Sequence, residues 1–224
     1  MKKFSIIFLT LILSLCACLF CGCEKQDDLE KYISELRTTV YEGESQNYKL
    51  SANYGFREYS LINDGKVGNK TYFLTFKLLD RQLDQQTYYL QWDFEGKQFN
   101  QEFKLSPSLH VLCLELEVEN LSASSLEISV GTLDKKEKVV LQNAIPKGTL
   151  TYKQALKSLR EKQADLVNSY YDQKGNFTAE IYQRIIVKEG KAYWYIGFAS
   201  GNGRLKALLI DGKNGSVLAV REIF

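Results

Sequence analysis

Apolar and polar residues alternate along the chain from Thr38 to about Asn143. Successive side chains of a β-strand point to opposite faces, so a period of two predicts strands that each bury one face. Turns rich in Gly, Asn, Asp and Ser separate these runs, as is typical of an antiparallel β-sandwich. The runs lie at residues 48–54, 72–78, 88–94, 99–105, 110–118, 126–130 and 138–142. Residues 38–145 are therefore predicted to form a β-sandwich. An immunoglobulin-like topology is the class that fits, although the Cys-Trp-Cys pattern of true immunoglobulin domains is absent.

A second region follows Pro146 and Gly148, which mark the best domain boundary in the chain. Thr151 and Gln154 form a capping box at the start of an expected helix. Four short strands separated by Gly-rich turns come next, at residues 181–188, 193–198, 204–210 and 217–221. The pattern predicts a small α+β domain over residues 148–224, with one helix and an antiparallel meander.

Residues 23–37 are expected to hold a short helix that lies against the first domain. Leu29, Tyr32, Ile33 and Leu36 recur at the spacing of one helical face. Asp27 is the expected N-cap of this helix.

Three stretches of the last region carry a family resemblance. They are Leu150-Thr-Tyr-Lys-Gln-Ala-Leu156, Ala192-Tyr-Trp-Tyr-Ile196 and Leu209-Ile-Asp-Gly-Lys-Asn-Gly-Ser-Val-Leu218. Together they resemble a PepSY-type domain over about a third of the chain. The resemblance implies an extracytoplasmic, non-catalytic module that binds or restrains peptidases or acts in envelope sensing, and it supplies no catalytic residues.

The first residues resemble a bacterial lipoprotein signal peptide. Lys2 and Lys3 precede an apolar run, residues 4–20, which ends at Cys21-Gly22-Cys23 and meets a polar stretch. The resemblance implies that residues 1–22 are removed and that palmitate-type acyl chains on Cys23 hold the protein at the extracytoplasmic face of the cell membrane.

Two alternatives stand beside this interpretation. Cys18 follows Leu15-Cys16-Ala17 and fits a lipobox better, but processing at Cys23 leaves a cleaner polar start. The apolar run is also long enough for a transmembrane anchor, although acidic residues follow it where a retained anchor usually has basic flanks.

Charge and cysteine content exclude several function classes. Without residues 1–22 the chain keeps 27 basic and 27 acidic residues, so nothing favours nucleic acid as a partner. Cys113 is the one cysteine after residue 23, which excludes an intrachain disulfide there. It is interpreted as a small buried hydrophobe, because the single histidine of the chain, His110, is expected on the opposite strand face.

Four further features have a structural and a functional interpretation. Asp211-Gly-Lys-Asn-Gly215 and Gly201-Asn-Gly203 are predicted to be tight turns, because the first lacks the ligands of a calcium loop and the second lacks the following helix of a phosphate site. Glu115, Glu117 and Glu119 alternate on a strand, as a solvated face does, although three carboxylates also suit a cation or a basic partner. Tyrosines and other aromatics are abundant, and Tyr193 and Tyr195 are expected to share one strand face.

The sequence has no enzyme motif, and no catalytic residue, cofactor or metal site is predicted. The hypothesis is a non-catalytic lipoprotein that binds a protein or peptide partner at the cell envelope, with peptidase regulation as the implied role. The alternative is a solute- or glycan-binding surface lipoprotein, which predicts an aromatic-lined pocket on the β-domain.

Overall fold

The computed structural model describes residues 28–58, 67–79, 86–107, 109–201 and 203–223. The predicted signal peptide and both candidate lipid sites, Cys18 and Cys23, lie outside these residues. The described elements are the 3-10 helix η1 (Leu29–Tyr32), the helices α2 (Tyr152–Lys162) and α3 (Ala164–Asn168), and thirteen strands. The strands are β1 (Ile33–Glu44), β2 (Lys49–Glu58), β3 (Lys70–Leu79), β4 (Tyr89–Phe94), β5 (Lys97–Glu102), β6 (Lys104–Ser106), β7 (Val111–Glu117), β8 (Ser125–Gly131), β9 (Lys136–Asn143), β10 (Ala179–Lys188), β11 (Lys191–Ser200), β12 (Leu205–Asp211) and β13 (Val217–Ile223).

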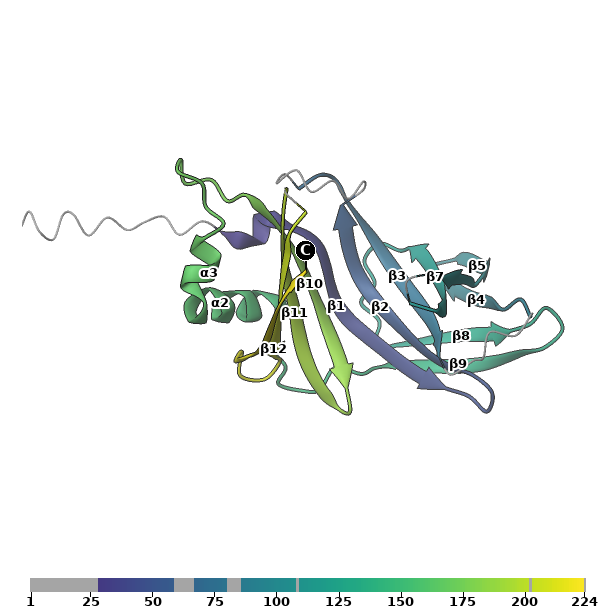
Figure 1. The fold of residues 1–224 in the computed structure, drawn as a ribbon. Coiled ribbons are helices and arrows are strands. Elements are labelled where there is room, and N and C mark those ends of the chain that lie inside the picture. Colours follow the sequence, from purple (N-terminus) through teal and green to yellow (C-terminus); the bar gives the residue numbers. More distant parts are fainter. Residues whose placement is uncertain (1–27, 59–66, 80–85, 108, 202, 224) are drawn as a thin grey trace, which may run out of the picture.

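All thirteen strands belong to one sheet, and β1 is its junction (Figure 1). On one side β1 pairs with β2, which continues through β3 and β7 to β6. On the other side the first half of β1 pairs with β10, while Tyr41 and Glu42 near its end pair with β9. The pairing of β1 with β10 is parallel, whereas the other ladders are antiparallel.

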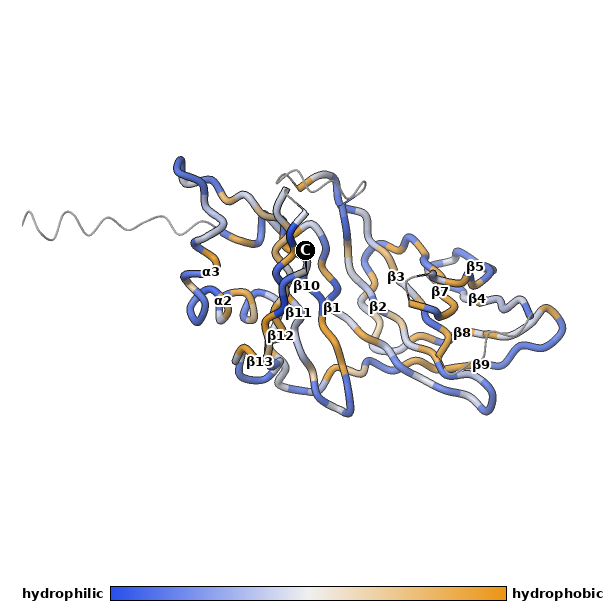
Figure 2. The backbone as a smooth tube through the Cα atoms, in the orientation of Figure 1, coloured by the Kyte–Doolittle hydropathy of each residue, from blue (hydrophilic) through white to orange (hydrophobic). Residues whose placement is uncertain are grey.

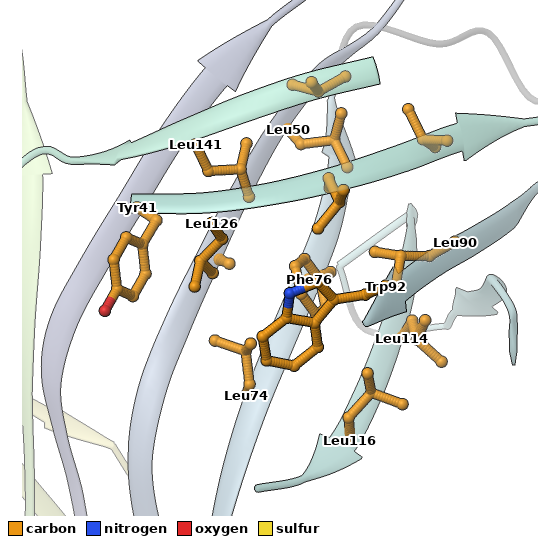
Figure 3. Close-up of a cluster of buried hydrophobic side chains, with 14 of the residues drawn as sticks. Tyr41, Leu50, Leu74, Phe76, Leu90, Trp92, Leu114, Leu116, Leu126 and Leu141 are labelled. Atoms are coloured by element: carbon orange, nitrogen blue, oxygen red, sulfur yellow. The ribbon is translucent and has the colours of Figure 1, made fainter. Parts of the chain in front are cut away.

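The first hydrophobic core lies between two parts of this sheet. Leu90 and Trp92 of β4 and Leu126 of β8 face Leu74 and Phe76 of β3 across it (Figure 3). The predicted alternation is present, because these residues are buried while their strand neighbours are mostly half-buried or exposed. The hydrophobic stretches of the chain accordingly lie mainly in the strands and the hydrophilic ones mainly in the turns (Figure 2).

The second core lies between α2, α3 and the meander β10–β13. Leu156 and Leu159 of α2 pack with Trp194, Ile196 and Phe198 of β11. The side chain of Thr151 accepts a hydrogen bond from the Gln154 backbone, and the side chain of Gln154 accepts one from the Thr151 backbone. The capping box and the four strands that follow are as predicted, whereas the one expected helix is two, α2 and α3, with the break at Gln163.

The prediction of an N-terminal helix is wrong beyond Tyr32. Only η1 is helical, with Asp28 as its N-cap, and the chain from Ile33 onward is strand β1. Two β-bulges, one after Ile33 and one after Arg37, shift the faces of this strand. As a result Ile33, Leu36 and Val40 are all buried in the second core. Their spacing of three and four residues imitates a helical face, which is why the periodicity misleads.

The mostly β character predicted from the sequence is confirmed. The sheet that encloses the first core is continuous and nearly closed, running from β6 through β1 to β5. The predicted boundary at residues 145–148 falls between β9 and α2. The second core nevertheless extends across that boundary, because the first half of β1 contributes to it. Among the described helices, none is long and apolar enough to cross a membrane.

Candidate functional site

A groove opens where β10 separates from β1. The last pair of their ladder is Arg37 with Arg184, and the two strands diverge beyond it. The groove has a volume of about 430 Å³. Its floor includes Ser51 and Thr75, which alternate along β2 and β3 with residues of the first core. The groove therefore lies on the sheet face that the first core leaves uncovered.

Basic and acidic residues line this groove in equal numbers. Three are basic and three are acidic: Arg37, Lys77, Arg184, Glu35, Glu42 and Glu115. The two signs cancel, so the groove offers oriented charges without a net attraction for an anion or a cation. Such an arrangement favours specificity of contact over long-range attraction.

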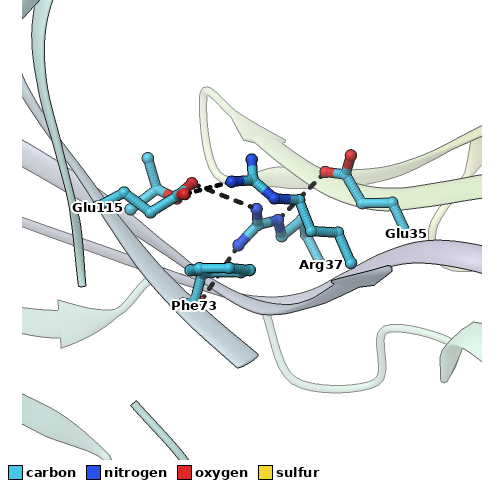
Figure 4. A network of polar contacts seen from close by, with 6 residues as sticks. Glu35, Arg37, Phe73 and Glu115 are labelled. Carbon is cyan, nitrogen blue, oxygen red and sulfur yellow. Dashed lines mark hydrogen bonds and ion pairs between the residues drawn. The ribbon is translucent and has the colours of Figure 1, made fainter. Parts of the chain in front are cut away.

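A buried guanidinium organises one end of the groove (Figure 4). Arg37 is 8% exposed. Its Nε donates to Glu35 Oε1 at 3.2 Å and its Nη1 donates to the Phe73 carbonyl at 3.2 Å. Because an unpaired buried charge is strongly unfavourable, these bonds fix Arg37 in place.

Glu115 links this arginine to a second one. Its Oε1 accepts a hydrogen bond from Arg57 Nη2 at 2.6 Å, and its Oε2 accepts one from Thr75 Oγ1 at 3.2 Å. Arg37 Nη2 lies 3.8 Å from the same carboxylate. The Arg57 guanidinium also lies over the Phe73 ring, 4.5 Å from its centroid. The polar end of the groove is thus a connected and preorganised network.

The groove also has apolar lining residues, namely Val40 of β1 and Ile185, Ile186 and Val187 of β10. Val40 and Ile185 are buried in the second core, and Val187 packs against it, so Ile186 is the apolar side chain that is exposed. Ile186 is 36% exposed. Tyr193 pairs with Ile186 on the neighbouring strand, and the guanidinium of Arg184 lies 4.6 Å from the centroid of the Tyr195 ring. The expected tyrosine face is therefore half-buried and adjoins the groove.

The backbone of β10 is also available in the groove. From Ile181 to Arg184 this strand is paired on both sides, with β1 and with β11. From Ile185 to Lys188 it is paired with β11, and no described strand pairs with it on the β1 side. Unpaired N–H and C=O groups on a strand edge form a template for another extended chain.

The structure separates the three glutamates that the sequence places together. Glu115 lines the groove, whereas Glu117 and Glu119 line a different hollow between β7 and the β4–β5 hairpin. Glu115 and Glu117 are on the solvent side of β7, as predicted, because Leu114 and Leu116 between them are buried, and Glu119 is exposed just beyond the end of the strand. The three glutamates are therefore exposed to solvent, and they line two separate hollows.

The predicted turns are confirmed. Asp211 Oδ1 accepts hydrogen bonds from the backbone N–H of Lys213 and of Asn214, which closes the β12–β13 turn. These two donors hold the pKa of Asp211 below its ordinary value. Gly203 donates its N–H to the Ser200 carbonyl in the preceding turn. The Asp211 side chain thus acts as the acceptor of a local turn.

Cys113 is half-buried on β7, and burial raises the pKa of its thiol. A raised pKa leaves less of the reactive thiolate at neutral pH. His110 lies outside the strand, in a left-handed turn conformation. Among the described residues, no group of three or more His, Cys, Asp or Glu side chains is placed to hold a metal ion.

Sequence reasoning missed the two arginines on which the groove depends. Arg37 fell inside the predicted helix, although the β-branched residues Thr38, Thr39 and Val40 directly after it favour a strand. Arg184 occupies an ordinary polar position of a predicted strand, so no local signal marks it. No known family model matches the chain, and no curated protein matches it either.

Proposed function

We propose that this protein is a non-catalytic lipoprotein that binds an extended segment of a protein or peptide in the groove between β1 and β10. A lipid on Cys23 would hold it at the extracytoplasmic face of the cell membrane. The unpaired edge of β10 within the groove is the observation that carries the proposal. An extended peptide gains affinity from backbone hydrogen bonds to such an edge and specificity from the side chains around it.

The lining of the groove suits a peptide of mixed composition. The exposed side chain of Ile186 would contact hydrophobic side chains, and the network around Arg37 and Glu115 would take polar ones of either charge. Binding would act by occlusion or scaffolding, without turnover. A peptidase is the partner class that the PepSY-type resemblance implies.

The first experiment tests binding and its place together. The full chain, purified with its anchor in detergent, is used to select peptides from a random display library, and the affinity of the enriched peptide is measured. Hydrogen exchange is then followed with and without that peptide. We expect slower exchange of the backbone amides between Ile185 and Lys188, because a bound strand would occupy this edge.

A matched pair of variants locates the site. Ile186→Asp places a charge at the exposed apolar side chain of the groove, whereas Leu133→Asp makes the same change at a side chain that is 70% exposed in the turn before β9. We expect Ile186→Asp to weaken peptide binding by about tenfold or more, which corresponds to about 1.4 kcal/mol, and Leu133→Asp to leave it unchanged. Equal effects of the two variants, or protection elsewhere than β10, would refute the groove as the site.

A further inference from the structure

A second hollow lies on the first part of the molecule, away from the groove. Its volume is about 320 Å³, at the small end of the range for ligand pockets. It is bounded by β3, by the β4–β5 hairpin and by the end of β7. The groove and this hollow share no lining residue.

Three aromatic side chains line this hollow: Tyr72, Phe94 and Phe99. Tyr72 is 41% exposed, and both phenylalanines are half-buried. Each of the three rings stacks on a neighbouring aromatic ring. Trp92 stacks on Phe94 at 4.7 Å and on Phe99 at 5.5 Å between ring centroids, and Tyr72 stacks on Tyr54 at 6.0 Å. Aromatic rings held in this way present a fixed surface at little entropic cost.

The charge of the hollow is negative. Glu95, Glu117 and Glu119 line it together with one basic residue, Lys97. Glu117 pairs with Phe73 and shares its sheet face, which is opposite to that of Tyr72. The carboxylates on the side of the rings are therefore those of Glu95 and Glu119, which with Lys97 leave a formal charge of −1. No described residue makes a hydrogen bond or an ion pair with any of the three carboxylates. This contrasts with the groove, where acidic and basic groups are equal in number and Glu115 is paired with Arg57.

We propose that this hollow binds an organic cation of the alkylated ammonium class. The negative faces of aromatic rings attract such cations, and unpaired carboxylates beside the rings add a Coulombic attraction that a neutral sugar would not feel. The cation could come from a free quaternary amine or from a basic side chain of a protein, because both present the same ammonium chemistry.

The test compares choline with its neutral isostere 3,3-dimethylbutan-1-ol, which has the same shape without the charge. The full chain is labelled with ¹⁵N and held in a detergent that carries no ammonium group. The indole N–H signal of Trp92 is followed during titration, because this ring stacks on both lining phenylalanines. We expect saturable shifts with choline, a dissociation constant at least about tenfold higher for the alcohol, and weaker choline binding at high salt.

Matched variants measure how much a lining carboxylate and a lining aromatic ring each contribute to choline binding. Glu119→Gln removes one lining carboxylate, and Glu127→Gln makes the same change at an exposed position of β8 outside the hollow. Tyr72→Leu removes one aromatic ring, with Tyr193→Leu, on β11, as its control. We expect the first member of each pair to weaken choline binding several-fold and the second to leave it unchanged.

The two sources are then separated by titrating a peptide with one central trimethyl-lysine. Tighter binding of this peptide than of choline points to a protein ligand, and the reverse points to a free amine; either result supports the ammonium site. Equal binding of choline and the alcohol, no saturation with choline or the peptide, or equal effects of Glu119→Gln and Glu127→Gln would overturn the proposal.

Discussion

Arg37 has the most demanding environment of any charged residue on the groove. Its guanidinium is nearly buried, and the strand beneath it approaches β2 so closely that only glycine fits at the paired position. A Cβ atom on Gly55 would lie 1.8 Å from the Leu36 carbonyl oxygen. The bulge after Arg37, the missing side chain at Gly55 and the bonds from Arg37 to Glu35 and Phe73 therefore specify one local conformation.

Removal of Arg37 is expected to destabilise the protein strongly. Arg37→Ala leaves the Phe73 carbonyl and the Glu35 carboxylate without their buried donor, which costs about 3 kcal/mol of unfolding free energy. The control is Arg57→Ala, which removes a half-exposed partner of Glu115 and is expected to cost about 1 kcal/mol or less. Urea denaturation measures both. A larger loss for Arg57→Ala would contradict the ranking.

The turn at Asp211 predicts a defined pH dependence. Because the folded state lowers the pKa of this carboxyl, its contribution to stability is fully present above the unfolded pKa of about 3.9 and is lost as the pH falls through the lower, folded value. In Asp211→Asn this part of the acid sensitivity should disappear. The unfolding free energy, measured from pH 6 to pH 2, should then fall less steeply below pH 4 than in the original chain. An unchanged slope would show that the turn does not depend on the ionised carboxylate.

The elements that the sequence predicts well are those with local signals. The alternation of residues 72–78, the turns with glycine and the Thr151–Gln154 capping box each depend on neighbours in the chain, and each is present in the structure. The parallel pairing of β1 with β10 joins Ile33 to Ile181, so no local pattern encodes it. The groove exists only because of that pairing, and the sequence therefore could not reveal it.

The capping box itself gives a prediction for α2. Thr151→Ala removes the acceptor for the Gln154 N–H and should lower the unfolding free energy by about 1 kcal/mol. Lys157→Ala is a suitable control, because this side chain is 78% exposed and its ion pair with Glu161 is long, at 3.9 Å. The control should stay within about 0.5 kcal/mol of the original chain in the same urea titration.

For the molecule as a whole, β1 couples the two cores. Tyr41 belongs to the first core and Val40, its neighbour, to the second. We expect one cooperative unfolding transition. Trp92 reports on the first core and Trp194 on the second, so the variants Trp194→Phe and Trp92→Phe isolate each signal. In each variant the fluorescence transition should coincide with the loss of far-ultraviolet circular dichroism, whereas two separated transitions would show that the cores unfold independently.

Attachment to the membrane is tested at the two candidate cysteines. Cys23→Ala should release the protein from membranes into the soluble fraction, because two acyl chains are required for stable anchoring. Cys18→Ala should leave it anchored, and mass spectrometry of the mature chain should find the lipid on residue 23. Release by Cys18→Ala instead would place the lipid on Cys18.

The shared strand also has a genetic consequence. A gene fusion that carried residues 148–224 alone into another protein would leave behind Leu29, Ile33, Leu36 and Val40, which complete the second core. The recipient would then expose the apolar face of β10 and lack the strand that β10 pairs with. Recombination at this point would yield two incomplete products, so we expect the two parts of the chain to be kept together in one gene.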